Sequence, residues 1–120
     1  MPLDPQQDVR LVDAQGRCLG SVSIERIEGD RVFGQIIVGP DFTAVRQVFQ
    51  EFEDAVSSQL FSEADRLSRE IDELGLRLAS DDGSETLQLG DVQIMNGSDL
   101  SCRVPNLGLT QAVRATAHAG

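Results

Sequence analysis

Residues 9–38 have the pattern of β-strands, and at the start of this segment hydrophobic positions recur with a period of two, which is typical of a strand with one buried face. Gln15-Gly16 predicts a turn inside this segment. When that turn is closed as a two-residue loop, Val9 stands opposite Val22, and the hydrophobic positions of the two flanking strands agree. The sequence therefore predicts a β-hairpin at the start of the chain.

A second turn is predicted near Gly29-Asp30, followed by a third strand from Arg31 to Val38. This strand contains the sequence Gln-Ile-Ile-Val, which is apolar on both faces. Strands of that kind are usually covered on both sides, at least in part, so we expect the third strand to be central in its sheet.

The period changes after Gly39-Pro40-Asp41, where apolar residues recur at spacings of three or four over residues 42–74. Gly75 is well placed as the C-terminal cap of this helical segment. As one straight helix, about 33 residues would span roughly 50 Å, whereas a compact domain of this length has a diameter of roughly 35 Å. The overhanging apolar stripe would then need a second chain to cover it.

The alternative is a break near Ser57-Ser58 or at Ser62. Ser62 followed by Glu63-Ala64-Asp65 resembles an N-cap with carboxylates in the first turn. The match is incomplete, because a capping box carries Glu or Gln where Asp65 stands. We expect one long or kinked amphipathic helix, and with it a homodimer.

Beyond Gly75 the period of two returns. Leu78 stands opposite Leu87 across a loop at residues 81–84, and the hydrophobic positions again agree. The apolar positions change phase after that pair, and Gly90 is the natural site for a β-bulge that would absorb the change.

Asn96-Gly97 predicts a last hairpin. A two-residue loop would set Ile94 against a polar residue, whereas a three-residue loop sets it against Leu100, so we expect the longer loop or a bulge. The last strand should end near Val104-Pro105, and residues 106–120 form a small-residue segment that we expect to be a mobile tail.

These elements predict a single α+β domain over residues 1–105. Its antiparallel β-sheet has five to six strands in the order βββ-α-βββ and packs against the one long or kinked amphipathic helix.

Charge narrows the choice of partners. The chain has a formal net charge of -10, and all ten of its basic residues are arginine. A field of that sign repels phosphate backbones and anionic lipid headgroups, so we expect neither nucleic acid nor membranes as partners. The chain has no apolar run of transmembrane length and its first residues do not resemble a signal peptide, so we expect a cytoplasmic protein.

Two segments together resemble the opening of a PRC-barrel domain: Leu11-Val-Asp-Ala-Gln-Gly-Arg-Cys-Leu-Gly-Ser-Val, and Arg31-Val-Phe-Gly-Gln-Ile-Ile-Val. The underlying pattern D-x-x-G-x-x-L-G-x-V is common to many hairpins. The long helical segment that follows departs from that family. We therefore assign no family on this resemblance.

Few residues are available for catalysis. The one histidine, His118, lies in the predicted tail, so no Ser-His-Asp or Cys-His arrangement can form inside the fold. Cys18 and Cys102 are far from the spacing of a zinc site, and we expect both to be small buried hydrophobic residues. The loop at 81–85 has a calcium-like composition but lacks the EF-hand pattern. We expect no cofactor, no metal and no catalytic residues.

Three hypotheses about function remain. The first is a non-enzymatic protein-protein interaction domain that self-associates through its helix, with an interface of Phe61, Leu67, Ile71 and Leu74. The second is an acidic inhibitor, immunity protein or nucleic-acid mimic that binds a basic enzyme surface. Its acidic face would consist of Glu51, Glu53, Asp54, Glu63, Asp65, Glu70, Asp72 and Glu73. The third is a small enzyme that uses carboxylates or a cysteine.

Overall fold

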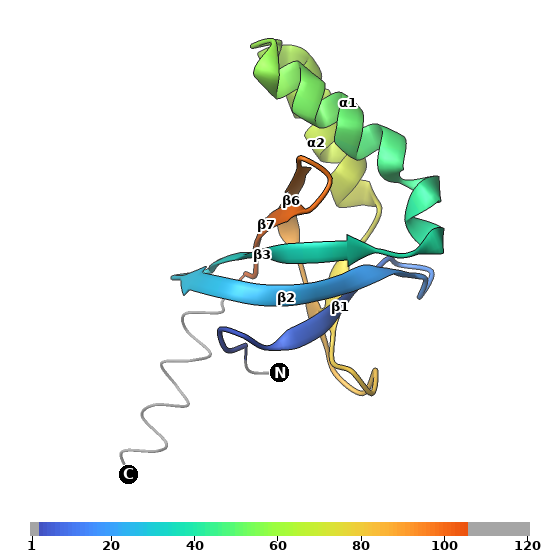
Figure 1. The fold of residues 1–120 in the computed structure, drawn as a ribbon. Helices are drawn as coiled ribbons and strands as arrows, with labels where there is room; N and C mark the ends of the chain where they lie inside the picture. The colour runs from blue at the N-terminus through green and yellow to red at the C-terminus, as the bar shows by residue number, and fades with distance from the viewer. Residues whose placement is uncertain (1–2, 106–120) are drawn as a thin grey trace.

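The structure is a computed structural model that describes residues 3–105, in which an antiparallel sheet carries a pair of helices (Figure 1). The predicted tail at 106–120, with His118, lies outside the described residues. The elements are β1 (Asp8–Val12), β2 (Cys18–Glu28), β3 (Arg31–Val38), a 3-10 helix η1 (Pro40–Ala44), α1 (Arg46–Ser57), α2 (Phe61–Glu73), β4 (Arg77–Ala79), β5 (Thr86–Gln88), β6 (Gly90–Met95) and β7 (Asp99–Arg103).

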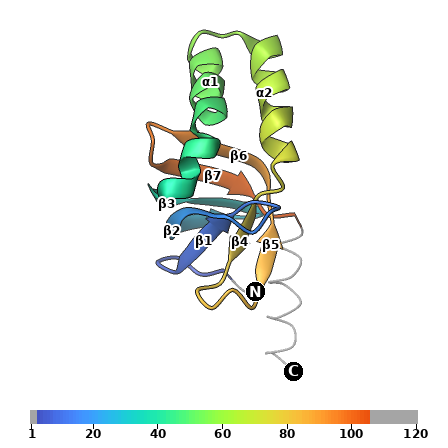
Figure 2. The same ribbon diagram turned by 90° about the vertical axis from the view of Figure 1, so that its right-hand side faces the viewer.

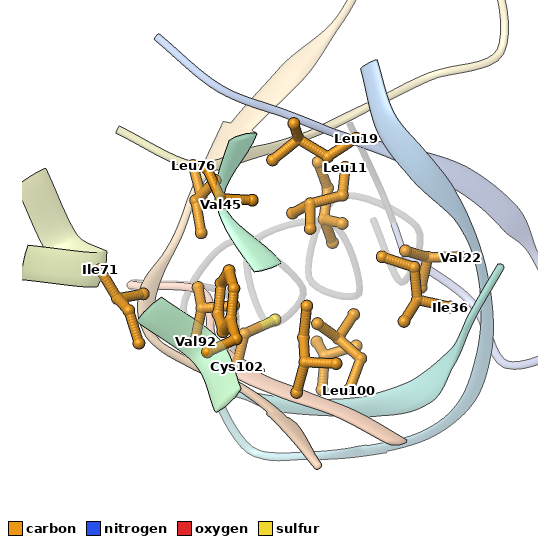
Figure 3. Packing of buried hydrophobic residues seen from close by; sticks show 14 of the residues in the cluster. Leu11, Leu19, Val22, Ile36, Val45, Ile71, Leu76, Val92, Leu100 and Cys102 are labelled. Carbon is orange, nitrogen blue, oxygen red and sulfur yellow. The ribbon is translucent and has the colours of Figure 1, made fainter. Parts of the chain in front are cut away.

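The sheet curls back on itself. Its strand order is β5-β4-β1-β2-β3-β7-β6, so β5 and β6 occupy its two ends, although only Leu89 separates them along the chain. The two ends of the sheet must therefore meet at Leu89. Figure 3 shows the result: the strands curve around an interior into which Leu11, Val22, Leu100 and Cys102 project.

The predicted α+β class and most of the predicted register are confirmed. Val9 pairs with Val22 and Leu78 pairs with Leu87. The strand from Arg31 to Val38 has the predicted bounds, and it lies between β2 and β7 in the sheet.

The last hairpin also follows the prediction. Ile94 pairs with Leu100 and Met95 pairs with Asp99, which leaves a three-residue loop between the strands. The register of β6 against β7 shifts between Gly90 and Gln93, where the bulge was expected. Seven strands are present in the described residues rather than five or six, because the bend at Leu89 divides one predicted strand into β5 and β6.

The prediction of one long or kinked helix is wrong, and the alternative break near Ser57-Ser58 is confirmed. Between α1 and α2 the chain reverses, and the two helices lie side by side as a hairpin (Figure 2). We call this pair of helices the helical hairpin. Both views show it projecting away from the sheet, with the turn between the helices at its far end.

The reversal uses a common helix-ending motif with an uncommon residue. The Gln59 amide donates to the Val56 carbonyl at 3.1 Å, and the Leu60 amide donates to the Ala55 carbonyl at 2.9 Å. This pair of bonds is the Schellman motif, which places one residue in the left-handed region, usually glycine. Here that residue is Gln59, with φ of 59°. The sequence prediction had no glycine to mark the break.

The two helices bury their facing stripes against each other and against the sheet. The base of the hairpin extends the interior of the sheet, since Ile71 belongs to the same buried cluster as Val92 and Cys102 (Figure 3). Towards the turn the facing side chains become small, with Ala55 on α1 and Ala64 on α2. The buried helical residues are Phe49, Phe52, Ala55, Ala64, Leu67 and Ile71.

Candidate functional site at the tip of the helical hairpin

The hairpin tip, which we define as residues 56–63, is an unbroken exposed stretch from the end of α1 to the start of α2. Four large hydrophobic side chains are exposed in residues 3–105, and three of them lie here. Val56 is 39% exposed, Leu60 is 55% exposed and Phe61 is 67% exposed. The fourth, Ile37, lies alone on β3. The tip is therefore the place where exposed apolar side chains gather.

Hydrogen bonds hold the backbone of the tip in place. Besides the two bonds of the Schellman motif, the Ser58 amide donates to the Asp54 carbonyl at 3.0 Å, and the Ala64 amide donates to the Leu60 carbonyl at 2.9 Å. Phe61 is the first residue of α2. Leu60 and Phe61 thus project from an ordered turn, so little backbone entropy would be lost when they contact another surface.

Two shallow hollows adjoin these side chains. The first, of about 450 Å³, is lined by Leu60, Phe61, Ser62 and Glu63. The second, of about 310 Å³, is a groove between the helices beside Leu60, and we call it the tip groove. Its lining combines apolar and charged side chains: Glu51, Asp54, Ala55, Ser58, Leu60, Glu63, Arg66 and Leu67.

The predicted acidic face surrounds the tip and runs down both helices. Seven of its eight carboxylates are exposed, and the eighth, Glu53, is half-buried and accepts a hydrogen bond from the Asn96 amide at 2.7 Å. Arg66 forms ion pairs with Glu63 and Glu70. Its hydrogen bond to Glu63 holds the pKa of that carboxyl below its ordinary value.

Two carboxylates of the tip groove accept hydrogen bonds from uncharged side chains. Glu51 accepts a hydrogen bond from the Gln47 side chain at 3.0 Å, and Asp54 accepts one from Gln50 at 3.3 Å. Both donors are neutral amides. The groove therefore has negative charge that its one arginine, Arg66, does not balance.

The four residues of the predicted interface have different environments. Leu67 and Ile71 are each 1% exposed, and Leu74 is half-buried. Because the chain folds back on itself, α1 and the sheet cover the stripe that a single helix would have offered to a second chain. Of the four, Phe61 alone is exposed, at 67%. Val56 and Leu60 belong to the same apolar pattern over residues 42–74, and nothing in that pattern indicated that they would be exposed.

A larger hollow of about 560 Å³ lies on the outer face of β2, β3 and β7. The side chains that line this hollow interact with one another. The Arg26 guanidinium lies over the Phe33 ring, 4.1 Å from its centre. The Gln35 amide donates to Glu25 at 3.2 Å and to Asp99 at 2.8 Å. This surface is a paired polar network, in contrast to the exposed hydrophobic side chains of the tip.

The two cysteines lie apart on strands separated by β3, and at opposite ends of it. Cys102 is fully buried as expected, whereas Cys18 is exposed, so that part of the prediction is wrong. Burial is the main cause that raises the pKa of the Cys102 thiol, to about 12. The thiol is therefore protonated at neutral pH and is not a nucleophile.

Asp13 is the buried charged residue of the described chain, at 4% exposed. Its carboxylate accepts hydrogen bonds from the Gln15 amide at 3.0 Å, the Arg17 amide at 2.9 Å and the Arg17 side chain at 2.7 Å. Burial alone raises its pKa, but the bonds from Arg17 and Gln15 outweigh burial and hold the pKa below its ordinary value. Asp13 therefore has a structural role in its turn.

The loop with calcium-like composition is also a self-contained turn. One oxygen of the Asp82 carboxylate accepts bonds from the Ser84 amide at 3.0 Å and from the hydroxyls of Ser80 and Ser84, each at 2.7 Å. These bonds, the one from the Ser84 amide foremost, lower the pKa of Asp82 to about 2. No group of three or more potential metal ligands occurs in residues 3–105.

The chain matches no known family model, and comparisons with curated proteins and with solved structures find no match either. No helix in the described part of the chain is long and apolar enough to cross a membrane.

Proposed function

We propose that this protein is a non-enzymatic interaction protein, in which the curled sheet presents the helical hairpin and the hairpin tip binds another protein. The observation that carries the proposal is the exposure of Leu60 and Phe61, next to one another, on a hydrogen-bonded turn. Single exposed apolar residues are normal on protein surfaces. A cluster at the projecting end of an element is typical of a binding site.

The partner we propose is a different protein rather than a second copy. A stable interface buries about 800 Å² on each side, far more than three partly exposed side chains supply. Along the outer faces of the hairpin the apolar stripe does not continue, because these faces carry the exposed carboxylates. A convex tip of this size fits a concave surface on the partner, where the whole of Phe61 can be enclosed.

We place this interaction in the cytoplasm. Both cysteines are free thiols, and Cys18 is exposed. Exposed free thiols persist in reducing compartments, whereas oxidising ones favour disulfides.

Site-specific photo-crosslinking tests the proposal in cells that naturally produce the protein. A photoreactive amino acid at Ser62, within the tip, should form a discrete adduct with one other protein. The same group at Glu28, on the sheet, should not. The variant Leu60→Ser/Phe61→Ser with the photoreactive group at Ser62 should lose the adduct while its thermal unfolding remains close to wild type, because both side chains are exposed.

Three results would contradict the proposal: no adduct from Ser62, the same adduct from both positions, or an adduct that persists in the double-serine variant. An adduct between two copies of the chain would instead support the self-association hypothesis.

A further inference from the structure

We infer the chemistry of the partner's binding surface, an inference that rests on the proposed function. The partner has an apolar pocket that receives Leu60 and Phe61. Arginine or lysine side chains border this pocket, and one of them enters the tip groove. The charged border of the tip decides what kind of protein can approach its exposed apolar side chains.

The charge around the tip has one sign. The segment 46–73 contains eight carboxylates and three arginines, and Arg66 is already bound to Glu63 and Glu70. A partner that brings its own carboxylates or phosphates to the apolar side chains would meet this field at close range. A second copy of the chain would do the same with its own tip. A basic rim is the complement that makes burial of Phe61 favourable.

The tip groove has the lining that a long cationic side chain needs. Leu60 provides exposed apolar surface for the methylene groups above the buried Ala55, while Glu51 and Asp54 provide carboxylates for the charged end. Arginine suits this arrangement especially well, because its planar guanidinium can donate to carboxylate oxygens in pairs. The groove opens directly beside Leu60, so one partner surface can contact both features at once.

To test the inference, the partner protein that crosslinks to Ser62 is purified without crosslinking and titrated against the full chain of this protein. The affinity is measured at about 0.1 M and about 1 M salt, between which the Debye length falls from about 10 Å to about 3 Å. The variant Glu51→Gln/Asp54→Asn removes two charges from the tip groove. A matched control, Asp30→Asn/Glu85→Gln, removes two exposed charges from the loops of the sheet.

We expect the dissociation constant of the wild type to rise about tenfold at high salt. At low salt, the dissociation constant of the groove variant should be about tenfold higher than that of the wild type. The control should stay within about twofold of wild type. The variant Leu60→Ser/Phe61→Ser should lose binding at both salt concentrations.

If the groove variant and the control bind alike, or if high salt leaves the affinity unchanged, the inference is overturned. The proposed function then stands, provided that the double-serine variant still fails to bind. If the double-serine variant binds like wild type, the proposed function is overturned as well. Capture of a second copy of this chain, or of a partner whose contact surface is acidic, would overturn the inference by itself.

Discussion

Large hydrophobic side chains are buried in the interior of the curled sheet but exposed at the hairpin tip. In the sheet Leu11, Val22 and Leu78 have no measurable exposure. In the hairpin the apolar stripe is covered from its base as far as Ala55 and Ala64, and beyond that point its large side chains face solvent. The sheet uses its apolar residues to fold, whereas the tip leaves apolar surface that folding does not use.

The energies involved explain why this contrast bears on function. Full burial of a Leu or Phe side chain contributes about 1.5 to 3 kcal/mol relative to exposure. In the isolated chain Leu60 and Phe61 forgo most of that stabilisation, since each is more than half exposed. A partner that encloses them can gain it, because the turn that carries them is already ordered.

The largest expected effect comes from comparing a buried and an exposed residue of α2. Leu67→Ala should lower the free energy of unfolding by about 2 to 5 kcal/mol, because it opens a cavity between the helices. Phe61→Ala removes a larger side chain but should cost less than about 0.5 kcal/mol, because that side chain is exposed. Urea unfolding of both variants measures the difference. Equal losses would show that the tip belongs to the core.

A smaller effect is expected where the sheet joins the hairpin. The Asp13 turn lies next to Ala14, whose amide donates to the Leu74 carbonyl at the end of α2 at 3.1 Å. Asp13→Asn should cost about 1 to 3 kcal/mol at pH 7, because it weakens three bonds to a buried group. Thermal unfolding of the variant at neutral pH measures this loss.

The pH dependence of that loss has a definite sign. The pKa of Asp13 is lower in the folded chain than its ordinary value of 3.8, so the stabilisation from Asp13 is complete above pH 3.8. It is lost as the pH falls through the folded-state pKa. The difference in stability between wild type and Asp13→Asn should therefore be constant near neutral pH and shrink in acid. A difference that grows on acidification would contradict this assignment.

The smallest expected change in stability comes from substitutions at the C-terminal ends of α1 and α2. Gln59→Gly should stabilise the protein by about 1 kcal/mol, because glycine adopts the left-handed conformation without the steric cost that Gln59 meets. Gly75→Ala is the matched control at the end of α2, where φ is +64° and an added Cβ would lie 2.7 Å from the Cβ of Ala14. That variant should be destabilised. Denaturant midpoints that fail to move in opposite directions would contradict this account of the two ends.

The two-residue period of β-strands made the register of the sheet largely predictable. A shift of one residue turns every side chain of a strand to the other face, so the hydrophobic pattern allows few registers. The pairings of Val9 with Val22 and Leu78 with Leu87 could be predicted for that reason, as could the three-residue loop before Asp99. The curling of the sheet was not predictable, since it depends on how the strand around Leu89 pairs with β4 on one side and β7 on the other.

The candidate site was less predictable than the sheet. The acidic face could be predicted as a solvated surface, because charged residues are rarely buried. The interface prediction included Phe61, which is exposed, together with Leu67 and Ile71, which are buried. All three lie on one stripe of period 3.6, and the period does not distinguish a residue that contacts its own chain from one that contacts solvent or a partner.

The sequence by itself determined which face of each element is apolar, where most strands turn, and where α2 ends, because Gly75 has a backbone preference that can be recognised without the fold. Tertiary structure decided the reversal at Gln59, a residue with no such preference. It also decided which part of the helical stripe is covered. Coverage depends on what packs against a surface, and that partner, whether a second helix, the sheet or another protein, is chosen by the whole chain rather than by a local pattern.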